Sequence, residues 1–283
     1  MNKVNLKDAE ALSNPYKVGI LGTVDDEGEV HLTLISSLQN KGEDQMMFAE
    51  FVEGESKRYI YERPKTGFFI MGLDKTFWMG QAEFTHCVTE GEDYVYFNEL
   101  PLFRYNTYCG VSVIHYADLI DISEKQPLNM AGVVANAIWV SMFKGLVAGD
   151  KSKQVLRPWA QEFTAVLGNL LFIGYKGENG IPKVVPIIQG QSASSSRIAF
   201  TRAPYADMLK DLKDGDRAAI YAMDLDMQAI EVKGVYHDGK MGIGYLDIDR
   251  VYNPVPPKAG YVYPEIRQEA VNWADEPLIE SLK

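Results

Sequence analysis

The chain has 283 residues with 28 Lys or Arg and 39 Asp or Glu, which gives a formal net charge of −11 and a pI of about 4.9. This balance argues against a nucleic-acid or anionic-membrane partner, because phosphate groups are bound by clustered Lys and Arg. The two cysteines, Cys87 and Cys109, lack the spacing of a zinc site or a disulfide framework. The charged N-terminal residues contain no apolar segment typical of a secretory signal, so a cytoplasmic location is expected.

The first half of the chain is predicted to be mostly β. Residues 1–16 resemble a short polar helix that ends at Asn14-Pro15. Residues 17–38 predict a β-hairpin, because two runs rich in Val, Ile, Leu and Thr flank a polar turn that ends in Gly28. Further strands are expected at 46–51, 67–71, 76–87, 93–97 and 111–122, with Ser56 capping a short helix at 57–62. About six short strands with one small helix indicate a closed or partly open antiparallel barrel.

Residues 128–148 form the one long apolar run. A membrane span needs about 20 apolar residues, so this run has to be weighed as a span. Polar side chains interrupt it at Asn129, Asn136, Ser141 and Lys144, and such groups are costly in lipid. Its apolar residues surround most of the helix, which favours a buried helix that connects two halves of the chain.

The second half repeats the order of elements in the first. Residues 170–190 resemble the opening hairpin, and strands are expected at 197–201, 217–222, 227–236 and 241–251, with a short helix at 206–212. Glycines and apolar residues recur at a fixed spacing of 152 positions, and one further pair at 154. The pairs are Gly22 and Gly174, Gly28 and Gly180, Ile35 and Ile187, Phe48 and Phe200, and, at 154, Gly80 and Gly234.

The repeat and the length of the chain together predict three parts. Residues 1–125 form a first barrel, 126–160 a helical connector, and 161–283 a second barrel with a Pro-rich C-terminal arm. The arm begins near Asn253 and is expected to be extended, followed by a short amphipathic helix at 264–273. Because the halves look alike, they are expected to pack as an internal pseudo-dimer, with a homodimer left open.

The order hairpin, strand, helix opened by Ser56-Lys57, strand, and strand with an interior G-x-A is similar to the FMN-binding split barrels of the pyridoxamine 5′-phosphate oxidase-like group. The resemblance covers residues 15–123 and about 163–252. It implies a tandem split β-barrel with FMN placed against the strand that follows the hairpin. Carried over residue by residue, it implies cofactor contacts at His31, Thr33, Leu34, Ile35, Ser36, Ala49, Glu50, Ser56, Lys57 and Lys75.

The residue types at the start of the expected helix suit a flavin phosphate, which carries most of a double negative charge near pH 7. Backbone N–H groups at a helix N-terminus, the Ser56 hydroxyl and the Lys57 ammonium are all donors that hold such an anion. The alternative without a bound ligand is that Ser56 only caps the helix and Lys57 is a solvated charge.

The sequence also departs from the family. Glu50, Glu53 and Glu55 crowd the expected phosphate site, and like charge weakens anion capture. His31 or Thr33 stands where a strand arginine is expected. In the second half Ala206-Asp207 replaces the Ser-Lys pair, with Thr201 and Arg202 as partial compensation. At most one FMN per chain is therefore expected.

The leading hypothesis is an FMN-dependent oxidoreductase with an unknown small-molecule substrate, in which the protein positions a cofactor that does the chemistry. Deazaflavin or haem remain open as cofactors, and no residue is singled out as a general acid or base. The competing hypothesis is a non-catalytic split-barrel binding or interaction protein that has lost or weakened its flavin site. The four histidines are scattered, so no metal site is expected.

Overall fold

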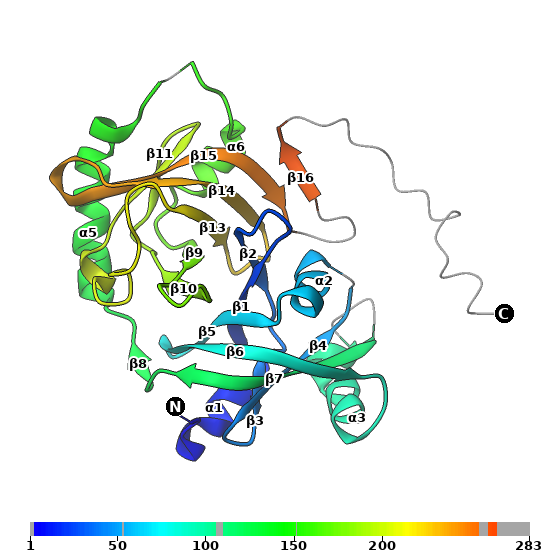
Figure 1. The fold of residues 1–283 in the computed structure, drawn as a ribbon. Coiled ribbons are helices and arrows are strands. Elements are labelled where there is room, and N and C mark those ends of the chain that lie inside the picture. The colour runs from blue at the N-terminus through cyan, green and yellow to red at the C-terminus, as the bar shows by residue number, and fades with distance from the viewer. Residues whose placement is uncertain (1–2, 53, 106–109, 151, 255–259, 265–283) are drawn as a thin grey trace.

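The structure is a computed structural model, and it describes residues 3–52, 54–105, 110–150, 152–254 and 260–264. The chain forms two eight-stranded antiparallel sheets, so the prediction of a mostly β fold is confirmed. In Figure 1 most of the first sheet, with α1 and α3, forms the lower part of the molecule, and the second sheet, with α5 and α6, forms the upper part.

The first sheet has the strand order β2-β1-β5-β6-β7-β4-β3, with β8 paired to β6. Its strands are β1 (Lys17–Val24), β2 (Val30–Leu34), β3 (Gln39–Lys41), β4 (Gln45–Glu50), β5 (Lys65–Gly72), β6 (Thr76–Val88), β7 (Val113–Ile122) and β8 (Gln126–Pro127). Its helical elements are η1 (Leu6–Asp8), α1 (Ala9–Ser13), α2 (Glu55–Glu62), α3 (Glu92–Glu99) and α4 (Pro101–Tyr105).

The second sheet has the order β10-β9-β13-β14-β15-β12-β11, with β16 paired to β15. Its strands are β9 (Leu170–Lys176), β10 (Pro182–Pro186), β11 (Gln191–Ser194), β12 (Arg197–Thr201), β13 (Arg217–Met223), β14 (Ala229–His237), β15 (Ile243–Asn253) and β16 (Gly260–Tyr263). Helical elements in this part are α5 (Met130–Phe143), η2 (Lys144–Val147), α6 (Pro158–Phe163), η3 (Ala203–Tyr205) and η4 (Lys240–Gly242).

The strand order of the second sheet repeats that of the first sheet strand by strand, which is consistent with a tandem arrangement. Backbone hydrogen bonds recur at the same spacing of 152 residues. Ile35 N donates to Gly19 O over 2.7 Å, and Ile187 N donates to Leu171 O over 2.8 Å. The turn glycines Gly28 and Gly180 have φ values of 76° and 75°, so each holds the left-handed conformation that the hairpin turn requires.

The glycines at spacing 154 also occupy matching places. A Cβ on Gly80 would lie 2.3 Å from Asp121 O, and one on Gly234 would lie 2.1 Å from Asp247 O. Each glycine therefore lets its strand approach the backbone of the next strand, β7 or β15, more closely than any side chain allows.

Three local predictions were wrong. Residues 93–97 lie in α3 rather than in a strand, because Glu92 and Asp93 occupy its first turn and favour a helix N-terminus. Residues 206–212 form turns after η3 rather than a helix. The helix α2 begins one residue before Ser56, with Gly54 as its N-cap. The predicted helix at 264–273 lies almost wholly outside the described residues.

The connecting helix α5 is less buried than its sequence predicted. Asn129 caps it by accepting a 2.9 Å hydrogen bond from Gly132 N. Only 22% of the apolar segment Met130–Val147 is buried, although by length and composition this segment is apolar enough to cross a membrane. Its polar side chains bind the second half: Asn136 Oδ1 accepts from Thr201 Oγ1, and Lys144 Nζ lies 3.3 Å from Gln191 Oε1.

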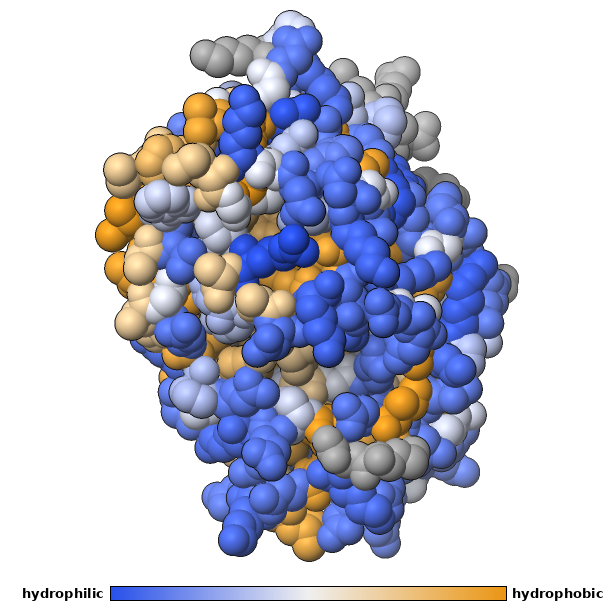
Figure 2. All heavy atoms as spheres, turned by 60° about the vertical axis from the view of Figure 1, so that its left-hand side comes forward, coloured by the Kyte–Doolittle hydropathy of each residue, from blue (hydrophilic) through white to orange (hydrophobic). Residues whose placement is uncertain are grey.

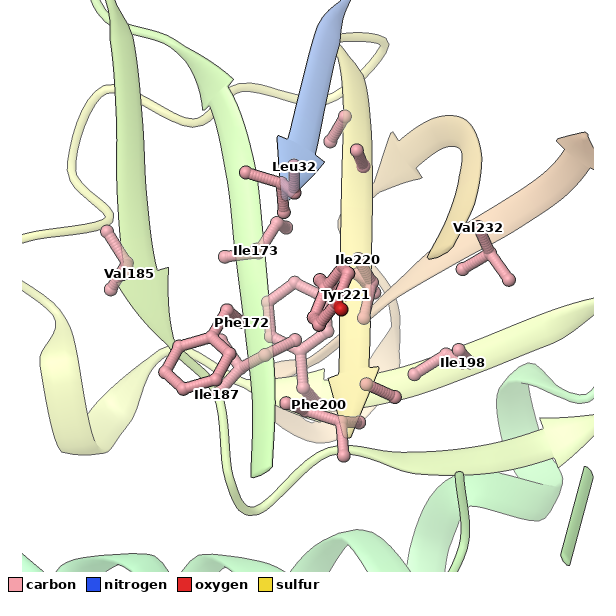
Figure 3. Packing of buried hydrophobic residues seen from close by; sticks show 14 of the residues in the cluster. Leu32, Phe172, Ile173, Val185, Ile187, Ile198, Phe200, Ile220, Tyr221 and Val232 are labelled. Atoms are coloured by element: carbon pink, nitrogen blue, oxygen red, sulfur yellow. The ribbon is translucent and has the colours of Figure 1, made fainter. Parts of the chain in front are cut away.

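The two halves share one core. The largest cluster of buried side chains combines Val30 and Leu32 of β2 with residues of β9, β10 and β13. Leu32 is fully buried and lies among these second-half side chains, near Ile173 and Ile220 (Figure 3). Gly174 makes room for this contact, because a Cβ there would come within 2.6 Å of Leu32 Cδ2. A separate, smaller cluster fills the first half alone.

Buried charges also join the halves. Lys233 Nζ donates to Asp25 Oδ2 over 2.5 Å, and both side chains are almost completely buried. Burial opposes the charge of Lys233, but the Glu231 and Asp25 carboxylates outweigh it and raise the pKa of the lysine. Near the surface, Glu29 binds Arg217 and Arg250 of the second half.

We predict that Lys233→Met destabilises the chain by about 3–5 kcal/mol, because it leaves the Asp25 carboxylate buried without its partner. The free energy of unfolding in urea measures this cost. The double variant Asp25→Asn with Lys233→Met is expected to lose less than the single variant, since it removes the Asp25 carboxylate that the single variant leaves without its cation. Lys213→Met, at an exposed position, serves as the control. Equal effects of Lys233→Met and Lys213→Met would contradict a stabilising contact between the halves.

Candidate functional site

The strand β2 and the start of α2 bring the predicted Ser56 next to Thr33, and the predicted Lys57 follows Ser56 on the helix. The Thr33 and Ser56 hydroxyls form a hydrogen bond. Ser56 is 1% exposed and Lys57 is 9% exposed, so the pair lies beneath the surface rather than on a solvated helix face. This burial argues against the alternative in which Lys57 is a solvated charge.

The ammonium of Lys57 turns back toward the loop that precedes the helix. Its Nζ donates to the Val52 carbonyl over 2.8 Å. No side chain caps the N-terminus of α2, where Gly54 holds the N-cap position in an extended conformation. The site thus combines a buried cation, two hydroxyls and a helix N-terminus, all of which are groups that favour an anion.

Glu50 and His115 lie deeper in the same region. The Glu50 carboxylate lies 3.5 Å from His115 Nε2, and the same nitrogen is 2.9 Å from the Tyr61 hydroxyl. The His115 ring stacks on Phe48. Burial, and to a smaller extent the charge of Lys57, lowers the pKa of His115 to about 4, so its imidazole is neutral near pH 7.

His31 reaches from β2 to the second half. Its Nδ1 lies 2.8 Å from Glu231 Oε2, and its ring contacts Tyr59 and Tyr252 edge-on. The other carboxylate oxygen of Glu231 accepts a hydrogen bond from Leu32 N over 2.8 Å. His31 therefore has a structural partner in β14, on the side of β2 that also carries Thr33.

The remaining predicted residues lie at varying distances from this group. Ala49 and Ile35 are buried, and Ala49 N donates a hydrogen bond to the Ser37 hydroxyl over 3.0 Å. Leu34 and Ser36 are half-buried along the same strand and the turn that follows it. Lys75 lies in the turn between β5 and β6, with a φ of 62°, and no hydrogen bond or ion pair of the described residues links it to the others.

The acidic residues of this region are mostly paired. Arg58 Nη2 lies 2.8 Å from Glu55 Oε2 and 2.7 Å from Asp26 Oδ2. Hydrogen bonds from Arg58 hold the pKa of Asp26 below its usual value. Glu53 lies outside the described residues. The negative charge that the sequence placed near an incoming anion is therefore partly offset by Arg58.

The second half does not reproduce this arrangement. The turns at 206–212 replace the helix, so this half has no equivalent of the N-terminus of α2, and Asp207 is exposed. Arg202 donates to the Leu212 carbonyl and to Asp238, and Lys183 is bound to Asp211. Both of these cations are thus paired with acidic residues of the second half.

Sequence reasoning missed several residues at the junction between the halves. Tyr59, Tyr252 and Tyr261 surround His31 and Lys233, with the rings of Tyr252 and Tyr261 5.3 Å apart. Two carry a signal in the sequence, because Tyr59 follows Ser56 by three positions on the helix and Tyr252 ends a predicted strand. Nothing in the sequence pairs them with His31.

Among the described residues, no group of three or more His, Cys, Asp or Glu side chains is arranged to hold a metal ion.

Comparison with known proteins identifies no family. No family model matches the chain, and no curated protein matches it. Solved structures match segments of less than half of it. An FMN-binding protein from Syntrophomonas wolfei subsp. wolfei is 24% identical, with a TM-score of 0.35, over 42% of this chain and 84% of that one. A putative pyridoxamine 5′-phosphate oxidase from Lactobacillus delbrueckii is 14% identical, with a TM-score of 0.33, over 44% and 100%. A protein described as an F420 reductase is 18% identical, with a TM-score of 0.33, over 42% and 98%.

We predict that stability falls as the pH is lowered from about 6.5 to about 4, in part because of His115. The folded state holds this imidazole neutral with a pKa of about 4, whereas the unfolded chain takes up a proton near pH 6.5. The histidine therefore contributes stability above pH 6.5 that is lost on acidification, by about 2–3 kcal/mol at pH 4.5.

Urea unfolding at neutral and acidic pH measures this loss for the wild type and for His115→Gln, which keeps a hydrogen-bonding side chain without a titrating ring. The variant is expected to lose less stability between the two pH values. Identical pH dependence in the two proteins would show that His115 does not stay neutral in the fold.

Proposed function

We propose that this chain binds one FMN through its first half and functions as an FMN-dependent oxidoreductase. The observation that carries the proposal is the group at the start of α2, where the Thr33 and Ser56 hydroxyls lie with the buried Lys57. Hydroxyls, an ammonium and a helix N-terminus suit the phosphate of a flavin nucleotide.

The residues present fit that phosphate in charge and in hydrogen-bonding capacity. Lys57 would supply the charge, Ser56 and Thr33 the hydroxyl donors, and the uncapped N-terminus of α2 the backbone donors. The resemblance to FMN-binding split barrels implies that the backbone of β2 would contact the ring system of the flavin. A bound flavin supplies hydride transfer, and the protein supplies position and a local electric field.

The asymmetry of the two halves supports a single site. In the second half the cations Lys183 and Arg202 are paired with Asp211 and Asp238, and no helix begins at the equivalent position. A second phosphate would have to displace these ion pairs and would meet the exposed Asp207.

One observation favours a second candidate, a non-catalytic binding protein with a weakened flavin site. The candidate phosphate donors already have protein partners, since Lys57 donates to the Val52 carbonyl and Ser56 is bonded to Thr33. These contacts would have to rearrange when an anion binds, which lowers its affinity.

Lys57→Gln tests the site, because it removes the charge and keeps a polar side chain of similar length. Charge-assisted hydrogen bonds contribute about 1.5–3 kcal/mol, so FMN affinity is expected to fall roughly ten- to a hundredfold. Quenching of flavin fluorescence on titration measures the dissociation constant, and thermal unfolding checks that the variant is folded. Asp207→Ala, at the matching place of the second half, is the control and should bind like the wild type. Wild-type affinity in Lys57→Gln would rule out this site.

Glu55→Gln provides a test of opposite sign. It removes a negative charge near the proposed phosphate and leaves Arg58 paired with Asp26 alone, so FMN should bind severalfold more tightly. The gain should shrink as salt is raised, because the charges are exposed to solvent. Glu62→Gln, at the far end of α2, serves as the matched control. An unchanged or weaker affinity in Glu55→Gln would contradict the placement of the phosphate.

The two candidate functions differ in turnover. With FMN bound, anaerobic addition of NADH or NADPH should bleach the visible absorbance of an oxidoreductase flavin. If the flavin binds at the Lys57 site and no such donor reduces it, the non-catalytic binding protein is the better description.

A further inference from the structure

The outer face of α5 is mostly apolar, with Ser141 as an exposed polar residue on it. Its inner face packs on the second sheet through Val133, Ala137 and Val140, each buried to 4% exposure or less. The outer face and its neighbours carry seven large apolar side chains, each 39–67% exposed. They are Met130, Val134, Ile138, Trp139, Met142, Leu146 and Met241, and we call them the α5 face. Figure 2, in which the α5 side of the molecule comes forward, shows apolar side chains gathered on this part of the surface.

The α5 face has a larger apolar area than the exposed patches of typical monomeric proteins. A large side chain that is about half accessible offers on the order of 100 Å². Seven of them together approach the roughly 800 Å² that each partner contributes to a standard protein interface, and they exceed the few hundred Å² of a typical monomer's largest patch. A water-exposed face of this area is expected to be covered by a partner.

The spacing of the residues indicates which partner. Met130, Val134, Ile138, Met142 and Leu146 follow one another at intervals of four, so they form a single ridge along the helix, continued into η2. The ridge is symmetric about Ile138. When two such ridges cross antiparallel about a two-fold axis, Ile138 meets its own copy and Val134 faces Met142 of the other chain. A row of this kind is complementary to itself.

The charge of the chain also favours a second copy of the chain over a lipid surface as the partner of the α5 face. The net charge of −11 opposes an anionic lipid surface, and membrane-binding helices carry many Lys and Arg residues on their polar face. In α5 and η2 the only charged residue is Lys144, and its ammonium turns inward to Gln191. Asn136 is likewise bound to Thr201, so the helix is fixed to the second half and is not free to cross a bilayer. Two apolar faces can associate without any charge pairing.

We infer that the chain forms a homodimer in which the α5 faces of two copies pack antiparallel about a two-fold axis through Ile138. The interface lies on the second half, away from the β2–α2 site, so the inference does not depend on flavin binding.

Analytical ultracentrifugation of the full chain at about 100 μM tests the inference, because a dimer with a micromolar dissociation constant is assembled at that concentration. The wild type is expected to sediment as a dimer. Ile138→Glu places one unpaired carboxylate from each copy at the axis and should weaken association at least about a hundredfold. Ile138 is exposed in the single chain, so the variant should keep its fold. Leu225→Glu, at an exposed apolar residue of the β13–β14 turn away from the α5 face, should remain dimeric.

A cysteine version tests the geometry. In a chain with Cys87 and Cys109 replaced by Ser, Ile138→Cys should form a disulfide-linked dimer on mild oxidation, whereas Met130→Cys should not, because its copies lie at opposite ends of the ridge. A monomeric wild type, an Ile138→Glu variant that stays dimeric, or preferential linkage of Met130→Cys would each overturn the inference. Flotation of a monomeric wild type with phosphatidylcholine vesicles would also overturn it and would assign the α5 face to a lipid surface.

Discussion

The arrangement of this molecule depends on the burial of the first hairpin against the second sheet. Asp25 closes the hairpin turn, where Glu29 N donates to its carboxylate over 2.7 Å, and the same carboxylate accepts from Lys233 on β14. A buried ion pair adds little stability over apolar packing, but its separation leaves two buried charges without partners. The halves are thereby held in one register, and Leu32 completes the core that they share.

This constraint also determines the candidate site. Side chains of a strand alternate between its two faces, so Val30 and Leu32 of β2 enter the shared core while His31 and Thr33 lie on the other face. The contact of His31 with Glu231 fixes the strand from the second half, and Thr33 then meets Ser56 at the start of α2. The residues of the site belong to the first half, but their positions depend on a carboxylate 200 residues further along the chain.

Much of the fold can be predicted from local patterns, because hairpin turns and strands have signals within a few residues. The hairpins and the longer strands were predicted in this way, whereas the short strands β3, β8, β11 and β16 were not. The strand predicted at 93–97 was wrong because its alternating aromatic residues imitate a strand, while the acidic first turn of α3 decides for a helix. For α5, composition indicated burial on more than one side, but only tertiary packing determines how many sides have a neighbour. The pairs Asp25–Lys233 and His31–Glu231 follow from no local rule, since each joins residues about 200 positions apart.

The two halves keep the same scaffold and differ in what it carries. Hydrogen bonds that close the hairpin and its following turn recur 152 residues apart, and so do the turn glycines, because the same hairpin turn needs a positive φ in each half. The segment after β4 is a helix with a buried lysine, whereas the segment after β12 is η3 and a series of turns, with Arg202 at its start paired with Asp238. Backbone geometry is thus common to both halves, whereas a helix with a buried lysine follows the fourth strand in the first half alone among the described residues. In a two-fold arrangement of equal halves both sites would be complete. In this chain the second half instead supplies Glu231 and Lys233, which hold the first site in place, and the surface on which α5 rests.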